Sequence, residues 1–320
     1  MKALFIKEKG QYPVYEDFDY RGEDELVRVK MLGSALNHRD LWIIKAQYAG
    51  LKYPIILGSD GVGIYNDRRV IINPSHNWGS DQSHQGAEYK ILGLPDNGTM
   101  AEYCCLDKKY LYDAPDHLSD AEAAALPLAG LTAYRALFVQ GRGQKGQKVL
   151  ITGIGGGVAL FLLQFAVAEG LEVYVTSGDS TKIEKAIDLG ARAGYNYADS
   201  DWASSFNRKE GGVDLVIDGA AGEGFADLLK IVRPGGKIVN YGGTRGKINN
   251  LVPQTVFWKQ ISIIGSTMGS DLDFRNMLEF VNKNKIKPVI DSFHKIGDYK
   301  NAFDKMDSSS QFGKLVLRNY

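Results

Sequence analysis

The sequence predicts an α/β protein with a β-rich first domain and a second domain built on a doubly wound parallel sheet. Short apolar runs bounded by Gly, Asn, Asp and Pro fill residues 1–120, as in a β-rich fold. From Lys148 onward, predicted strands alternate with predicted helices, which is typical of βαβ units. The 320 residues also exceed the roughly 250–300 residues at which a single core stops growing.

Composition narrows the classes of partner. Lys+Arg and Asp+Glu both number 38, so the net charge is zero and no strong field favours nucleic acid. The longest apolar run, residues 158–168, contains Gln164 and is shorter than the roughly 20 residues of a membrane span. The opening MKALFIKEKGQY indicates a first strand rather than a signal peptide. We therefore expect a cytoplasmic protein that acts on a small molecule, without nucleic acid or membrane partners.

The sequence lacks the cysteine and histidine patterns of zinc sites. Its two cysteines, Cys104 and Cys105, are adjacent on a predicted strand, so their side chains point to opposite faces. No two of the five histidines are four residues apart, and there is no CxxC or HExxH run. We expect no structural zinc and no metal site.

The predicted elements of the first domain follow in order. A short helix is expected within 37–48, and a long surface loop or lobe over 74–98. The expected strands are 2–7, 25–32, 55–58, 61–65, 68–73 and 101–106. Ser119 and Glu122 form a capping box that opens a helix, which Pro127 interrupts before a second helix begins.

The second domain follows the alternating pattern, and the chain then closes with helices and a strand. Expected strands are 148–153, 172–177, 194–197, 213–220, 236–243 and 262–267, and expected helices are 158–170, 180–190 and 224–232. Two later helices are expected from Phe274 and over 301–306. The final strand, 314–320, has no place in the doubly wound pattern, so we expect it to join the first domain's sheet.

A glycine cluster between the strand 148–153 and the next helix predicts a dinucleotide site. Glycines permit a tight turn and close approach of a pyrophosphate to the helix N-terminus. The cofactor-binding candidates there are Gly153, Gly155, Gly156, Gly157 and Val158, where Val158 replaces the last glycine of a strict GxGxxG. A glycine-rich turn without a ligand is the alternative.

The end of the second strand favours NADPH. An NAD site places an acid there for the ribose 2′-OH, whereas this chain has Ser177, with Lys182 following. A hydroxyl and a lysine can bind a 2′-phosphate that an acid would repel. Asp179 could still serve as the ribose acid after a shift of register.

Several motifs in order resemble the medium-chain dehydrogenase/reductase superfamily, in its zinc-independent quinone-oxidoreductase-like branch. The matching segments include ALNHRDLWI, PIILGSDGVG, GTMAEYCCL, AALPLAGLTAYRAL, VLITGIGGGVAL and FGKLVL. The resemblance implies a GroES-like catalytic domain over 1–123 and a Rossmann nucleotide-binding domain over 124–268. Residues 269–320 would return to the catalytic domain. Relatives of this kind often carry a zinc-binding alcohol dehydrogenase label by homology alone.

The resemblance also implies the loss of the catalytic metal. Zinc-dependent members carry Cys where this chain has Asn37, His-Glu where it has Ser59 and Asp60, and a further ligand near Leu128. Asn, Ser and Leu cannot replace thiolate and imidazole ligands. The expected reaction is hydride transfer from NADPH to a quinone, enone or alkenal.

By the same resemblance, the catalytic candidates are Tyr48, Asn37 and Asp40. Tyr48 would donate a proton or bind an oxyanion, Asn37 would position the nicotinamide or substrate, and Asp40 would brace the loop. A rim position for Tyr48 and a helix-capping role for Asp40 are the alternatives. His38 and Arg39 are expected to face solvent.

The remaining expectations concern the cofactor, the assembly and two other functions. Further cofactor contacts implied by the resemblance are Thr132, Tyr241, Gly242, Ser266, Thr267 and Lys314, although Lys314 could simply cap a strand. A homodimer through the strand 262–267 is expected.

The competing functions are a zinc-type alcohol dehydrogenase relative without a known substrate and a nucleotide-binding protein without catalysis.

Overall fold

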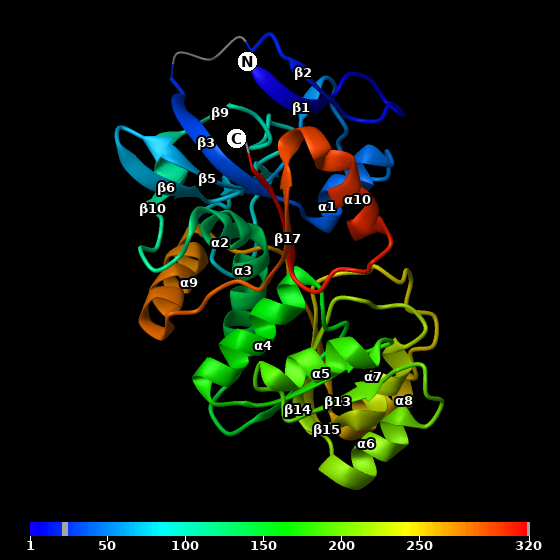
Figure 1. The fold of residues 1–320 in the computed structure, drawn as a ribbon. Coiled ribbons are helices and arrows are strands. Elements are labelled where there is room, and N and C mark those ends of the chain that lie inside the picture. Colours follow the sequence, from blue (N-terminus) through cyan, green and yellow to red (C-terminus); the bar gives the residue numbers. More distant parts are fainter. Residues whose placement is uncertain (21–24, 319–320) are drawn as a thin grey trace. The chain divides into compact units, whose positions relative to one another are not determined.

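The protein forms two compact units, seen here in a computed structural model that describes residues 1–20 and 25–318 (Figure 1). One unit comprises residues 1–131 and 269–320, and the other comprises residues 132–268. The division falls eight residues after the expected boundary at 123/124. The reason is that helix α3 (Pro127–Tyr134) begins within the first unit. The N–H of Leu128 donates to Asp60 over 2.7 Å, and a Cβ on Gly130 would lie 2.8 Å from Met277 Sδ.

The main sheet of the first unit is assembled from both ends of the chain. Its order is β10-β6-β5-β3-β18-β17, with β9 also paired to β3. The strands are β3 (Val27–Ala35), β5 (Asp60–Tyr65), β6 (Arg68–Ile72), β9 (Tyr103–Leu106), β10 (Leu111–Asp113), β17 (Ile290–Lys295) and β18 (Lys314–Arg318). Because β18 pairs antiparallel with β3, with Val316 opposite Ala35, the expected return of the final strand is confirmed. Its expected last two residues, 319–320, lie outside the described part.

Smaller elements complete the first unit. A second sheet has the order β2-β1-β4, and a short pair β7-β8 lies in the segment 74–98 that was expected to be a loop or lobe. These strands are β1 (Lys2–Ile6), β2 (Val14–Asp17), β4 (Ile55–Ile56), β7 (Ser75–His76) and β8 (Lys90–Ile91). The helices are α1 (His38–Ile44), α2 (Asp120–Ala125), α9 (Asp271–Asn284) and α10 (Tyr299–Asp307), with 3₁₀ turns at Lys108–Tyr110 and Ile296–Asp298.

The core of the first unit joins α1 to the C-terminal segment. Leu41 and Ile43 of α1 share one buried cluster with Phe303 and Met306 of α10 and with Leu315 of β18. This packing explains why the last fifty residues belong to the first unit. Strand β17 was not expected, because its sequence IDSFHK alternates only weakly and much of it is exposed.

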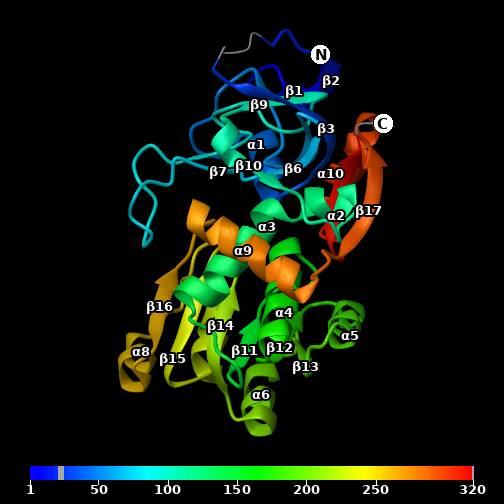
Figure 2. The ribbon, with the colours of Figure 1, turned by 90° about the vertical axis from the view of Figure 1, so that its left-hand side faces the viewer.

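The second unit is a single parallel sheet, which confirms the predicted α/β fold class. The order is β13-β12-β11-β14-β15-β16, and Figure 2 shows these strands side by side. They are β11 (Lys148–Ile151), β12 (Glu172–Ser177), β13 (Ala193–Asn196), β14 (Val213–Asp218), β15 (Val232–Asn240) and β16 (Ser262–Gly265). The chain runs outward from β11 in one direction and from β14 in the other. The strand order therefore reverses between β11 and β14, where a ligand of such a sheet binds.

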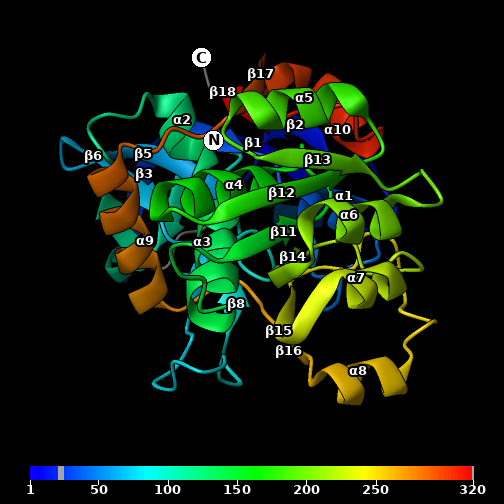
Figure 3. The same ribbon diagram turned by 90° about the horizontal axis from the view of Figure 1, so that it is seen from below.

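Helices cover both faces of this sheet (Figure 3). Helices α6, α7 and α8 pack on one face in a common core, while α4 and α5 contact strands β11, β12 and β13. Their bounds are α4 (Gly157–Glu169), α5 (Ser180–Asp188), α6 (Trp202–Glu210), α7 (Phe225–Ile231) and α8 (Pro253–Lys259), and a π-helical segment, Arg135–Gln140, follows α3.

Helices α6 and α8 were not expected. In α6 only Trp202, Ala203 and Phe206 are buried, among six more polar or exposed residues. In α8 no residue is buried, so its sequence carries no apolar stripe toward the core. Among the described residues, no helix has the length and apolar character needed to cross a membrane.

Candidate functional site

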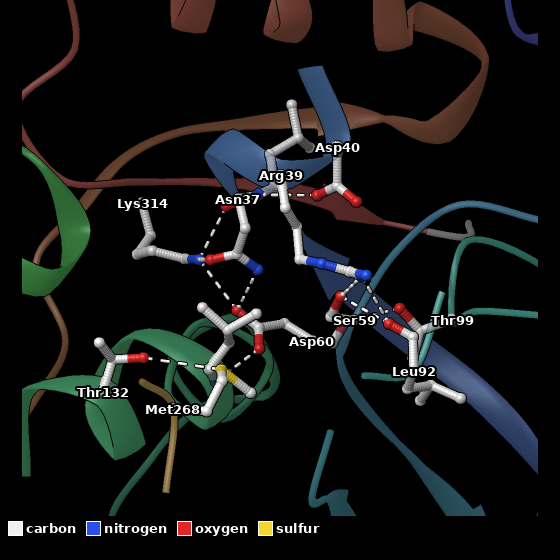
Figure 4. Close-up of polar contacts among 12 residues, drawn as sticks. Asn37, Arg39, Asp40, Ser59, Asp60, Leu92, Thr99, Thr132, Met268 and Lys314 are labelled. Atoms are coloured by element: carbon white, nitrogen blue, oxygen red, sulfur yellow. Dashed lines mark hydrogen bonds and ion pairs between the residues drawn. The ribbon is translucent and has the colours of Figure 1, made fainter. Parts of the chain in front are cut away.

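A buried lysine lies at the centre of the polar site in the first unit (Figure 4). Lys314, at the start of β18, is 4% exposed. Its ammonium group donates to the Leu36 carbonyl over 2.7 Å, to Asn37 Oδ1 over 2.7 Å and to Asp60 Oδ2 over 2.9 Å. All three N–H groups of the ammonium therefore have acceptors, and we call Asn37, Asp60 and Lys314 the lysine cluster.

Both carboxylate oxygens of Asp60 also have hydrogen-bond donors. Its Oδ2 accepts Asn37 Nδ2 over 2.9 Å as well as Lys314, and its Oδ1 accepts the N–H of Leu128 over 2.7 Å. Asp60 is fully buried, so this carboxylate depends on the three donors for its solvation. It also stabilises the first turn of α3, where unpaired N–H groups favour an anion.

The two charges determine how the amide of Asn37 is oriented. An ammonium can only donate and a carboxylate can only accept, so Oδ1 must face Lys314 and Nδ2 must face Asp60. An amide carries two N–H groups, and Asp60 takes one of them. The other is a donor with a defined direction.

Arg39 is buried, so the expectation that it faces solvent was wrong. Its Nη1 donates to Ser59 Oγ over 2.6 Å and to the Leu92 carbonyl over 2.8 Å. These acceptors compensate for the loss of water around the guanidinium. The Arg39 Cζ also lies 5.0 Å from the ring centroid of Tyr48, a cation–π distance. Tyr48 thus lies beside a buried cation and is only partly buried itself.

Asp40 is a buried cap of α1. Its Oδ2 accepts the N–H of Asn37, the N-cap residue, over 2.8 Å, while its Oδ1 has no hydrogen-bond partner. Burial raises the pKa of Asp40 to about 6, against the lowering effect of Arg39. The capping contact accounts for one oxygen, and the other is buried without a donor.

The donor set of this cluster does not fit a metal ion. Asp60 is the one carboxylate in it, its lone pairs are already engaged, and an ammonium occupies the space next to it. Across residues 1–20 and 25–318, no group of three or more His, Cys, Asp or Glu side chains is placed to bind a metal. A divalent cation would have to displace Lys314 and bind an amide, a hydroxyl and one carboxylate, a poor set for zinc.

The glycine turn of the second unit fits a dinucleotide. Gly153 and Gly155 have φ values of +65° and +115°, which disfavour residues with a Cβ. A Cβ on Gly153 would have no heavy atom within 4 Å, so the space beside the turn is open. Gly156 is the N-cap of α4 and supplies no side-chain acceptor, so the first N–H groups of this helix, at Gly157 and Val158, are available to an anion.

The acid in the turn after β12 caps the following helix. Ser177 Oγ accepts the N–H of Asp179 over 3.1 Å. Asp179 is the N-cap of α5, and its Oδ1 accepts the N–H and Oγ1 of Thr181 over 2.9 and 2.7 Å. Lys182 follows in the first turn of the same helix. Both capping contacts use Oδ1, so the alternative in which Asp179 serves the ribose stays open through Oδ2.

Asp218 organises the loops after β14 and β15, and sequence reasoning missed it. It is 1% exposed, and its carboxylate accepts Thr152 Oγ1 over 2.6 Å and Asn240 Nδ2 over 3.0 Å, besides two backbone N–H groups. The signal was an acid at the end of an apolar strand, in VDLVID. The side chain therefore joins the ends of β11, β14 and β15.

The other cofactor candidates of this unit lie near the same edge of the sheet. Tyr241 packs on Gly219, whose Cβ would lie 2.5 Å from the Tyr241 ring, and burial raises the pKa of Tyr241. Gly242 also packs closely on Gly219, because a Cβ on Gly242 would lie 2.7 Å from the Gly219 carbonyl oxygen. Ser266 Oγ is buried and has no hydrogen-bond partner. Thr267 follows it, and Thr132 is buried beside Met268.

The structure thus brings some predicted residues together within each unit. Asn37, Asp40 and Lys314 lie within one buried network of the first unit, with Tyr48 against Arg39. Lys314 does more than cap its strand, because its side chain is the centre of that network. The glycine-turn residues, Ser177, Tyr241 and Ser266 belong to the second unit.

Comparison with known proteins identifies two family models in the chain. Residues 23–116 match the alcohol dehydrogenase GroES-like domain, and residues 157–283 match the zinc-binding dehydrogenase model. Among curated proteins, the zinc-type alcohol dehydrogenase-like protein YogA of Leptosphaeria maculans is 35% identical, over 91% of this chain and 90% of its own. The quinone oxidoreductase of Mus musculus is 32% identical, over 69% and 70%.

Solved structures agree over the whole length. A structure described as an NAD-dependent alcohol dehydrogenase has a TM-score of 0.92 at 31% identity and covers 100% of both chains. The quinone oxidoreductase of Thermus thermophilus, also solved in complex with NADPH, has a TM-score of 0.83 at 25% identity, over 99% of this chain and 100% of its own.

Proposed function

Because the chain belongs to the medium-chain dehydrogenase/reductase superfamily, we propose that it is a metal-free, NADP(H)-dependent oxidoreductase. The proposed acceptor is a quinone, enone or alkenal. The proposed domains are 1–123 for catalysis and 124–268 for the coenzyme, with 269–320 completing the first. When bound, the reduced nicotinamide supplies the hydride.

The observation that carries the metal-free part is the buried ammonium of Lys314. By the resemblance, zinc-dependent members have Cys at the position of Asn37 and His-Glu at the positions of Ser59 and Asp60. Here the side-chain nitrogen of Lys314 is bonded to Asn37 and Asp60, and Ser59 is bonded to Arg39. Positive charge is thus already supplied to the carboxylate by Lys314, which favours chemistry without a Lewis acid.

A reductase of this kind needs hydrogen-bond donors for the oxyanion that forms on the acceptor. Two groups of the first unit are candidates for these donors. The second N–H of Asn37 has a direction set by Lys314 and Asp60, and the hydroxyl of Tyr48 is carried on a ring that packs on Arg39. We assign oxyanion binding or proton donation to Tyr48, positioning of substrate or nicotinamide to Asn37, and bracing of α1 to Asp40.

The proposed coenzyme is NADPH, bound by the glycine turn, Ser177, Lys182, Tyr241, Gly242, Ser266, Thr267 and Thr132. The capping role of Asp179 supports NADPH over NADH, because Oδ1 of the nearest acid is bonded to Thr181 and the strand itself ends in Ser177 rather than in an acid. One of the similar structures was solved with NADPH, whereas another is described as NAD-dependent, so the relatives themselves use both.

We further propose a homodimer through the edge strand β16. Ile263 on this strand is exposed, and Trp258 and Phe257 of the preceding helix α8 are 82% and 65% exposed. An open strand edge beside large apolar side chains favours pairing with a second copy. A cytoplasmic location is proposed with it.

The test combines coenzyme binding with turnover. NADPH and NADH are titrated against the protein, and quinones, enones and alkenals are then screened by the loss of reduced-nicotinamide absorbance. We expect NADPH oxidation with one of these classes, unchanged after chelator treatment and without stoichiometric zinc in the protein. Turnover that disappears on chelation and returns with zinc would instead identify the zinc-type alcohol dehydrogenase alternative. Coenzyme binding without any turnover would favour the non-catalytic alternative.

The assignment of Tyr48 has a separate test. Tyr48→Phe should lower kcat by about 10²-fold if the hydroxyl donates to the acceptor. Unchanged kcat would make Tyr48 a rim residue and leave the reductase class standing.

A further inference from the structure

The side chain of Arg245 crosses the carboxyl-end edge of the parallel sheet. Arg245 follows β15, yet its Nη2 donates to the hydroxyl of Tyr197, which follows β13, over 2.9 Å. Its Cζ lies 4.7 Å from the centroid of the same ring. The guanidinium is therefore held both by a hydrogen bond and by a cation–π contact.

Tyr197 places this cation beside the turn that reads the coenzyme ribose. The N–H of Tyr197 donates to the Ser177 carbonyl over 3.2 Å. A Cβ on Gly178 would lie 2.8 Å from the Tyr197 hydroxyl. The oxygen that accepts from Arg245 is thus in contact with the turn after β12.

The loop that carries Arg245 is anchored at its backbone. The N–H of Arg245 donates to the Ala220 carbonyl over 2.9 Å, and a Cβ on Gly222 would lie 2.7 Å from the Arg245 carbonyl. The loops after β14 and β15 therefore lie against each other, next to the point between β11 and β14 where the strand order reverses. A dinucleotide in such a sheet passes this point.

The acids nearby each have a hydrogen-bond partner of their own. Asp179 caps α5, as described above, and Glu223 accepts Asn249 Nδ2 over 2.7 Å. By contrast, a guanidinium has five N–H donors, and Tyr197 takes one. Planar, paired donors of this kind match the oxygens of a phosphate better than an ammonium does.

We propose that Arg245 binds the 2′-phosphate of NADPH and, with Tyr197 as its support, determines the coenzyme preference of this chain. The proposal deepens the proposed function and rests on it. Sequence reasoning looked for this group within a few residues of β12 and found Ser177 and Lys182. Arg245 is 68 residues after Ser177, so the sheet alone brings it there.

The experiment measures dissociation constants of NADPH and NADH for the full-length wild type and for Arg245→Gln, at one ionic strength. Losing a charge-assisted contact should weaken NADPH by about 10- to 100-fold and leave NADH within about twofold. Lys247→Gln is the matched control, because Lys247 is an exposed cation on the same loop and should change neither constant by more than about twofold. Tyr197→Phe, which keeps the ring and removes the acceptor, should weaken NADPH by a smaller factor.

Each outcome discriminates. If R245Q weakens NADPH and NADH equally, or leaves both unchanged, the assignment of Arg245 is wrong although the enzyme can still be an NADPH reductase. If K247Q weakened NADPH binding as much as R245Q, the effect of Arg245 would be one of general surface charge. That result would also overturn the assignment. Wild-type protein that binds neither coenzyme would instead contradict the proposed function itself. All three variants change exposed side chains, so circular dichroism is enough to check their folding.

Discussion

The ammonium of Lys314 and the carboxylate of Asp60 are both buried, so each depends on the other for its stability. Their side chains are 5% and 0% exposed and the atoms are 2.9 Å apart. Removing one partner of such a pair leaves an uncompensated charge, whereas removing both can cost much less. The lysine cluster is therefore a point where stability and site geometry are coupled.

We expect Lys314→Met to lower the free energy of unfolding by roughly 3–5 kcal/mol, and Asp60→Asn to have a similar effect. The double variant should lose clearly less than the sum, because no buried charge is then unpaired. Urea unfolding measures all three. Lys2→Met breaks the exposed pair with Asp17 and serves as the control, with an expected change of about 0–1 kcal/mol. Strict additivity of K314M and D60N would show that the two groups are not coupled.

Asp40 should make stability depend on pH. Burial raises its pKa from 3.8 to about 6, so the folded protein holds this proton more tightly than the unfolded chain. This contribution is fully present below about pH 4 and is lost as the pH rises through about 6.

Asp40→Asn removes that titration and keeps an oxygen for the N–H of Asn37. Relative to the wild type, D40N should become more stable between pH 4 and pH 7, by up to roughly 3 kcal/mol for a shift of about two pKa units. Denaturant unfolding at a series of pH values gives the difference. A difference that does not vary with pH would mean that Asp40 titrates normally.

At the scale of single elements, the turn from β11 into α4 combines backbone strain with ligand binding. Gly155→Ala should cost about 1 kcal/mol of stability, because φ is +115° there, and should weaken NADPH binding by more than tenfold if the turn carries the pyrophosphate. Gly10→Ala is the control, since Gly10 has φ of +81° in the first unit with open space around it. It should show the stability cost alone. Equal NADPH affinity in G155A and wild type would contradict a pyrophosphate site at this turn.

Elements with strong local signals were predicted from the sequence, and elements with weak ones were not. The capping box at Ser119 and Glu122 is present at the start of α2, and the two-residue period of apolar runs located most strands. Helix α8 could not be predicted because none of its residues is buried and both Phe257 and Trp258 are exposed, and α6 because its pattern is too short. In both cases the neighbouring helices and strands supply the stabilising contacts.

At the scale of the whole molecule, the exposed apolar surface beside β16 predicts the assembly. We expect a mass near twice the 35.2 kDa of the chain, measured by light scattering after gel filtration. Trp258→Glu should shift the protein to the monomer, because a charge in an apolar contact is costly to desolvate. Phe293→Ser changes another exposed aromatic residue, of 50% exposure in the first unit, and should leave the dimer intact. A wild-type monomer would exclude the proposed interface.

The sequence by itself determined the fold class, the order of most elements, the glycine turn and the absence of a thiolate and imidazole ligand set. These features depend on periodicity, on glycine's backbone freedom or on residue chemistry, all of which are local. The tertiary structure alone determined which charges meet. Lys314 lies 254 residues from Asp60 and Arg245 lies 48 residues from Tyr197, and both pairs form because strands distant in the chain belong to the same sheet. Hydrogen bonds between such groups depend on distances of a few ångströms, which no local pattern in the sequence specifies.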